Sequence, residues 1–124
     1  MGPQYSPHPA RRVLELLLVE RATFRELAAA EPVPAEALRG APPAIRTVEA
    51  AIPAHHVLVV GYQSPDKGLE TLTVEPLAIR YNPAHHVVLY CWLPDQDTLA
   101  SLRLDRIASA QDTGRSFEPR TTDV

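Results

Sequence analysis

The stretch that decides the fold is residues 87–107, VVLYCWLPDQDTLASLRLDRI. Residues 87–93 form a continuous apolar run rich in Val, Leu, Tyr and Trp, which is typical of a strand buried on both faces. Residues 100–105 alternate between apolar and polar side chains, as expected of a strand with one buried face. Residues 94–97, Pro-Asp-Gln-Asp, are turn formers, so the whole stretch is predicted to be a β-hairpin.

Strand patterns continue before and after this hairpin. A helix is predicted over residues 43–52, because Ile45, Val48 and Ile52 recur at helical spacing, and Pro53 should end it. Pro76 is expected to mark a break or an edge position in the second strand, since proline cannot donate a ladder hydrogen bond. The five predicted strands are residues 56–63, 69–74 with a further segment at 77–81, 86–93, 98–105 and 107–111. Because short antiparallel strands leave exposed edges, we predict a small, closed or nearly closed barrel.

The N-terminal part is predicted to be helical. A first helix should begin near residue 9 and present the apolar side chains of residues 13–19 on one face. A second should begin at Thr23, with Glu26 at capping-box spacing, and a short third helix is expected over residues 34–38. Residues 1–42 are thus predicted as a helical segment and residues 43–124 as the barrel domain. The predicted fold class is α+β, with the helices packed on the barrel.

The second and third of these helices resemble the helix-turn-helix of bacterial transcription regulators. The Glu-Leu-Ala of residues 26–28, Val33 and Leu38 fall in register with that pattern. Pro32 replaces the turn glycine, however, and residues 34–37 offer no Arg, Lys, Asn or Gln to bind base edges in the major groove. The expectation is a degenerate helix-turn-helix or a plain helical hairpin that covers the barrel.

Composition narrows the possible functions. Lys and Arg number 12 against 15 Asp and Glu, a net charge of −3, so binding to phosphate would need a local cluster of arginines. The single Cys91 excludes an intrachain disulfide and a multi-cysteine zinc site, and we expect it to be a small core residue in a reducing compartment. No apolar run approaches the ~20 residues of a membrane span. We therefore expect a cytoplasmic protein without membrane contact.

The motif Pro-Ala-His-His-Val occurs twice, at residues 53–57 and 83–87. Imidazoles bind Zn, Cu or Ni, but adjacent strand residues point to opposite faces, so the two histidines of a pair cannot hold one ion. We predict polar residues beside turns, with no metal and no cofactor. The sequence also lacks a Gly-rich phosphate loop, a nucleophile elbow and a catalytic Cys–His spacing, so no enzyme is expected.

From residue 48 to about residue 120, the chain resembles the WYL domain of bacterial transcriptional regulators. The matching motifs, in order, are Gly-Tyr at 61–62, Val-Glu-Pro-Leu at 74–77, the apolar strand at 87–93, Leu-Arg-Leu-Asp-Arg-Ile at 102–107, and Phe117. Val-Val-Leu at 87–89 stands where the family has its naming tripeptide. The resemblance implies an Sm-like (SH3-like) β-barrel that senses a ligand, nucleic acid or nucleotide, and signals to an attached DNA-binding domain.

Members of this family typically carry arginines on the barrel that contact the phosphates of the ligand. The resemblance therefore implies a ligand or nucleic-acid site formed by Arg80, Arg103 and Arg106. Two other positions that usually hold arginine are Leu72 and Ala100 in this chain. Each lost cation removes a salt-dependent share of the affinity for phosphate.

Two hypotheses for function follow. The first is a ligand-sensing regulatory module that binds a single-stranded nucleic acid or a nucleotide through these arginines. The second is a degenerate WYL barrel that binds no ligand and serves in protein interaction or oligomerisation, for example as a homodimer. In that case Arg103 and Arg106 would form structural ion pairs with Asp105 or Glu75, each worth about 0–1 kcal/mol if exposed. Convergence of the arginines on one open surface would favour the first hypothesis.

Overall fold

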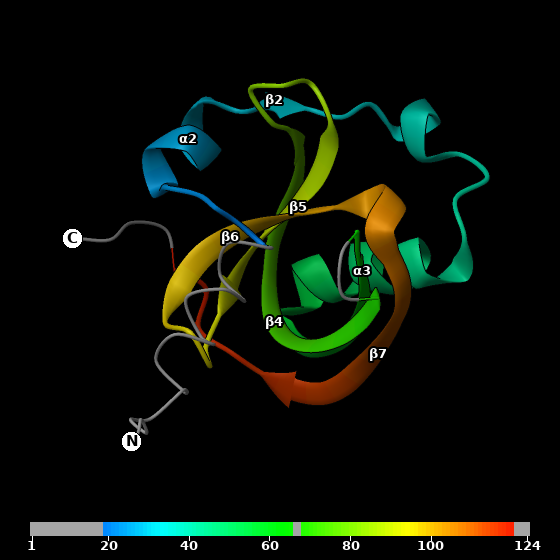
Figure 1. Cartoon of the computed structure of the whole chain (residues 1–124), viewed down its shortest axis with the longest axis vertical. Coiled ribbons are helices and arrows are strands. Elements are labelled where there is room, and N and C mark those ends of the chain that lie inside the picture. The colour runs from blue at the N-terminus through cyan, green and yellow to red at the C-terminus, as the bar shows by residue number, and fades with distance from the viewer. Residues whose placement is uncertain (1–18, 66–67, 121–124) are drawn as a thin grey trace, which may run out of the picture.

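The structure is a computed structural model that describes residues 19–65 and 68–120 (Figure 1). The helical elements are α2 (Phe24–Ala29), α3 (Pro43–Ala54) and the 3-10 helices η1 (Ala35–Leu38) and η2 (Leu104–Arg106). The strands are β1 (Glu20–Arg21), β2 (Glu31–Pro32), β3 (His56–Ser64), β4 (Gly68–Tyr81), β5 (Val87–Leu93), β6 (Thr98–Arg103) and β7 (Ile107–Ser116). The helix expected near residue 9 lies outside the described residues.

The seven strands form one antiparallel sheet with the order β1-β6-β5-β4-β3-β7, and β2 pairs with β4 beside this path. β1 and β7 end the order and do not pair with each other in the described part of the chain, so the sheet is open. The prediction of N-terminal helices packed on a closed, five-stranded Sm-like barrel is therefore wrong. The described chain is mostly β-structure with two α-helices.

The N-terminal segment causes part of this difference, because it adds strands to the sheet. β1 pairs with β6, and β2 pairs with the end of β4. Pro32 and Pro34 favour extended backbone in the residues that precede them, so α2 ends after six residues. The third predicted helix is the single 3-10 turn η1. Strands of two residues carry no periodic signal, which is why the sequence did not indicate them.

β4 runs through Pro76 without the predicted break. Pro76 lies opposite Cys91 of β5, and the register shifts between Pro76 and Ala78, so Leu77 is the extra residue of a β-bulge. A bulge accommodates proline within a sheet because the ladder of hydrogen bonds is interrupted there. The result is one bent strand of 14 residues that pairs with both β3 and β5.

The hairpin predicted over residues 87–107 is present as β5 and β6, and β5 is buried on both faces as predicted. β6 differs from the prediction, because its four central residues are all buried and its last predicted residues belong to η2. The N-terminal segment contributes to the burial of this hairpin through two contacts with β5. The ring of Phe24 stacks on that of Trp92, with centroids 6.2 Å apart, and the Tyr90 hydroxyl donates a hydrogen bond of 2.5 Å to Glu26.

α3 packs on the opposite face, as Figure 1 shows, and its buried side chains include Ile45 and Val48 of the predicted stripe. Pro53 lies in its last turn, and the helix is capped by His55 in the left-handed conformation, with φ 57°. The predicted helix is thus confirmed, two residues longer than expected. Cys91 is fully buried in the core beneath it, as predicted, and burial raises the pKa of its thiol.

Candidate functional site

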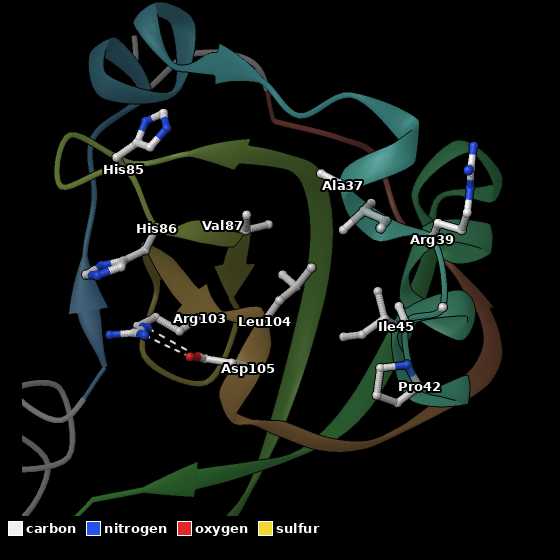
Figure 2. Close-up of a pocket in the computed structure, with 13 residues that line it drawn as sticks. Ala37, Arg39, Pro42, Ile45, His85, His86, Val87, Arg103, Leu104 and Asp105 are labelled. Atoms are coloured by element: carbon white, nitrogen blue, oxygen red, sulfur yellow. Dashed lines mark hydrogen bonds and ion pairs between the residues drawn. The ribbon is translucent and has the colours of Figure 1, made fainter.

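A pocket of about 420 Å³ lies between the η1–α3 connection and the adjoining ends of β5, β6 and η2. Figure 2 shows His86 and Arg103 at one end of it and Arg39, Pro42 and Ile45 along the opposite wall. We call this the Arg103 pocket. Its lining residues are Ala37, Leu38, Arg39, Gly40, Ala41, Pro42, Ile45, His85, His86, Val87, Arg103, Leu104 and Asp105.

Arg103 is held at this pocket from both its backbone and its side chain. Its backbone N–H donates to the Tyr62 hydroxyl at 3.0 Å, which ties the end of β6 to β3. Its guanidinium donates to both carboxylate oxygens of Asp105, with Nη2–Oδ2 2.7 Å and Nε–Oδ1 3.2 Å (Figure 2). The Asp105 side chain is 64% exposed and that of Arg103 29%, so water competes for this ion pair and its strength is modest.

The turn between β4 and β5 places two histidines at the rim of the pocket. Asn82, which is buried, accepts the backbone N–H of His86 on its side-chain oxygen at 2.8 Å and that of His85 on its carbonyl, also at 2.8 Å. His85 adopts a left-handed conformation, with φ 67°, and its ring stacks on Tyr81 with centroids 4.3 Å apart. This turn is therefore well fixed.

The lining of the Arg103 pocket is weakly cationic. It contains two arginines, Arg39 and Arg103, against the single carboxylate of Asp105, together with the two rim histidines. Arg39 follows η1 on the wall opposite Arg103, and Figure 2 shows its guanidinium directed away from Arg103. Sequence reasoning did not identify Arg39, His85 or His86 as site residues, because tertiary packing alone brings these turns beside β6. The Asn-Pro turn that precedes His85 and His86 was the sequence feature that could have indicated a fixed turn at this position.

Arg80 lies apart from this pocket. Val88 is opposite Arg80 in the β4–β5 pair and opposite Arg103 in the β5–β6 pair, so both arginines lie in one row on the same sheet face. With β5 between them, their backbones are about 10 Å apart. Arg80 Nη1 donates to the carbonyl of Ile79 at 2.8 Å, and Arg80 lines two other pockets. The structure thus gives Arg80 and Arg103 a common face but separate pockets.

Three more positions remain from the comparison with the family: Arg106, and Leu72 and Ala100, where the family usually has arginine. Arg106 ends η2, three residues after Arg103, is partly buried and does not line the Arg103 pocket. Ala100 is fully buried in the core, and Leu72 packs against the same core. These two positions therefore serve core packing in this chain.

The two Pro-Ala-His-His-Val motifs both lead into a strand, β3 in the first case and β5 in the second, as predicted. In each, the first histidine has positive φ, so each motif forms the turn before its strand. His56 Nδ1 lies 3.0 Å from Asp112 Oδ2. Among the described residues, no group of three or more His, Cys, Asp or Glu side chains is placed to hold a metal ion.

The model of the WYL domain family matches residues 43–112, which is more than half of the chain. The chain belongs to the WYL domain family. The matched region begins at α3 and ends within β7, so it contains Arg80, Arg103 and Arg106, whereas Arg39 precedes it.

Among solved structures, the WYL chain is similar in fold to the proteasome accessory factor B/C (PafBC) of Arthrobacter aurescens. The TM-score is 0.54 and the sequence identity 20%, and the similarity covers 71% of this chain and 13% of that protein. The chain therefore corresponds to a small part of the length of that protein. No curated protein matches its sequence. In the described residues, no helix is long and apolar enough to cross a membrane.

Proposed function

We propose that this WYL domain is a non-enzymatic, cytoplasmic regulatory module that senses a single-stranded nucleic acid or a nucleotide, with Arg103 as its main phosphate contact. The observation that supports this most directly is the position of Arg103 in a pocket of about 420 Å³, within the ~300–1,000 Å³ usual for small-ligand sites. The Asp105 carboxylate that pairs with it is mostly exposed. A phosphate, which also accepts two hydrogen bonds from one guanidinium, would replace this carboxylate or share the arginine with it.

The other predicted arginines would contribute at a distance. Arg106 lies three residues further along the chain and would contact a neighbouring phosphate outside the pocket. Arg80, about 10 Å from Arg103 on the same face, would be reached only by a ligand that extends beyond the pocket. A chain of net charge −3, with Arg39 and Arg103 lining the pocket and Arg80 and Arg106 outside it, should bind weakly and with marked salt dependence.

Fluorescence anisotropy with labelled single-stranded oligonucleotides, measured across a salt series, tests this function. Arg103→Ala should weaken binding at least about tenfold at low salt, since a hydrogen bond to a charged group is worth about 1.5–3 kcal/mol. It should also lower the slope of log K against log salt by about 0.7, the value for one phosphate contact on a single strand. Arg106→Ala should weaken binding by a smaller factor.

Arg115→Ala is the matched control, because Arg115 is exposed on β7 and lines none of the described pockets, while its loss changes the net charge equally. It should change the affinity less than twofold. Equal losses in the Arg103 and Arg115 variants would indicate a non-specific charge effect. Absence of any binding by the unchanged chain at low salt would exclude the nucleic-acid version of the proposal.

A second candidate function is protein interaction or oligomerisation without a ligand. The two hydrogen bonds from Arg103 to Asp105 favour it, because they already occupy the guanidinium. Leu72 and Ala100 also favour it, because these two positions pack in or against the core and supply no cation. Sedimentation velocity over a wide concentration range tests the oligomeric form of this proposal. A concentration-dependent homodimer, together with no oligonucleotide binding, would favour this candidate over the first.

A further inference from the structure

A second pocket, of about 500 Å³, lies between α2, the bulged part of β4 and the segment that follows β7. Phe24, Leu27 and Leu77 give it an apolar surface, and Arg80 and Arg120 supply its charge. We call it the Arg80–Arg120 pocket. Its described lining contains no acidic residue, in a chain whose net charge is −3.

Arg120 is positioned by an aromatic stack rather than by an ion pair. Its guanidinium carbon lies 4.3 Å from the centroid of the Trp92 ring, a cation–π contact, and Trp92 stacks in turn on Phe24. Glu75 is opposite Trp92 in the β4–β5 pair, and its carboxyl group interacts electrostatically with Arg120. Burial raises the pKa of the Glu75 carboxyl, and the positive charge of Arg120 opposes this rise.

Arg80 contributes the second cation from the sheet. One of its five N–H groups donates to the neighbouring carbonyl of Ile79 at 2.8 Å, which orients the guanidinium. In the described part of the chain, no carboxylate lies within ion-pair distance of Arg80 or Arg120. Two guanidinium groups beside an apolar surface are complementary to a ligand that carries both carboxylates and apolar side chains.

We propose that the Arg80–Arg120 pocket is a docking site for an acidic, apolar peptide segment of a partner protein. Apolar side chains of the partner pack against Phe24 and Leu77, and its carboxylates bind Arg80 and Arg120. Phe24, Leu27 and Arg120 lie outside the region that matches the WYL family model, residues 43–112. The site thus combines residues of the matched domain, Leu77 and Arg80, with residues outside it, and it does not depend on the ligand proposed for the Arg103 pocket.

The test uses the full chain and two labelled probes. The first is an acetylated, amidated peptide of alternating glutamate and leucine, and the second has lysine in place of glutamate. The glutamate peptide should bind saturably by fluorescence anisotropy and the lysine peptide should not. Because Trp92 is the only tryptophan and lies beneath Arg120, its emission should change on binding. Arg80→Ala and Arg120→Ala should each weaken binding at least fivefold.

Arg46→Ala is the matched control, since Arg46 is exposed on α3 and lines none of the described pockets. It should leave peptide binding unchanged. Arg120 is exposed, so its variant keeps the test valid even if the partly buried Arg80 is needed for folding. No binding of the glutamate peptide, or binding that both pocket variants leave unchanged, overturns the proposal.

Displacement of the glutamate peptide by a single-stranded oligonucleotide that itself requires Arg120 would also overturn it, because the pocket would then be part of a nucleic-acid surface. A different set of results would show that the function proposed for the Arg103 pocket is wrong. In that case oligonucleotide binding is absent or independent of Arg103, while peptide binding still requires Arg120.

Discussion

Single polar side chains attach the N-terminal segment to the sheet. The hydroxyl of Tyr90, a fully buried residue of β5, donates to the Glu26 carboxylate, and both burial and this bond raise the pKa of the Tyr90 hydroxyl. Sequence patterns placed Tyr90 in a buried strand, but they gave no sign of its partner 64 residues away. Likewise, Asp105 was considered as a partner of Arg103 from its spacing, whereas the histidines that share the pocket were not.

Tyr90→Phe removes the hydroxyl with almost no change in shape. The free energy of unfolding should fall by about 1.5–3 kcal/mol, the value of one hydrogen bond to a charged group. Urea denaturation followed by Trp92 fluorescence measures this. Tyr81→Phe is the control, because the Tyr81 hydroxyl bonds to no described residue, and it should change stability by less than about 0.5 kcal/mol. Equal effects of the two variants would show that the Tyr90–Glu26 bond contributes nothing.

The His56–Asp112 contact gives a pH-dependent prediction. The hydrogen bond with His56, and a second from the backbone N–H of Gly114, lower the pKa of Asp112 below 3.8. A lowered carboxyl pKa stabilises the fold above 3.8, and this contribution disappears as the pH falls through the folded-state value. When the pH is lowered from neutral to well below 3.8, the free energy of unfolding should therefore fall less in Asp112→Asn than in the unchanged chain. Parallel stability profiles of the two proteins in urea titrations would contradict this.

At the scale of elements, long periodic segments were predicted well and short or irregular ones were not. The apolar stripe of residues 45–52 predicted α3, and the apolar run of residues 87–93 with the turn after it predicted the β5–β6 hairpin. The bulge at Leu77 was missed because proline usually interrupts a strand, and the local sequence does not show that a neighbouring strand will accept a register shift. β1 and β2 were missed because two residues form no pattern.

The pairing of β3 with β7 depends on a glycine. Gly61 lies opposite Ser109, and a Cβ added at Gly61 would be 2.5 Å from the Ser109 hydroxyl oxygen. Gly61→Ala should lower the free energy of unfolding by about 1–3 kcal/mol, the usual cost of overpacking. In a Ser109→Ala background the same change should cost much less, because the clashing oxygen is gone. A double-mutant cycle by urea denaturation measures this, and simple additivity of the two changes would contradict the contact.

For the whole molecule, the sequence indicated the family correctly and the closure of the sheet incorrectly. The motifs at residues 61–62, 74–77 and 102–107, on which the resemblance rested, all lie within the region that matches the family model. Closure depends on whether β1 and β7 meet in space, and on the strands that the N-terminal segment adds; neither is encoded in local patterns. The same applies to the pockets. Their walls come from segments far apart in sequence, so Arg103 lines one pocket while Arg80 lines two others.

The central claim is that the Arg103 pocket binds the phosphate-bearing ligand. Chemical-shift mapping of the ¹⁵N-labelled chain, titrated with a short single-stranded oligonucleotide at low salt, tests it most directly. We predict the largest shifts at Arg103 and Asp105, at the histidine turn that precedes β5, and at the η1–α3 connection. Shifts concentrated at Arg80 and Arg120, or no shifts at all, would contradict the claim.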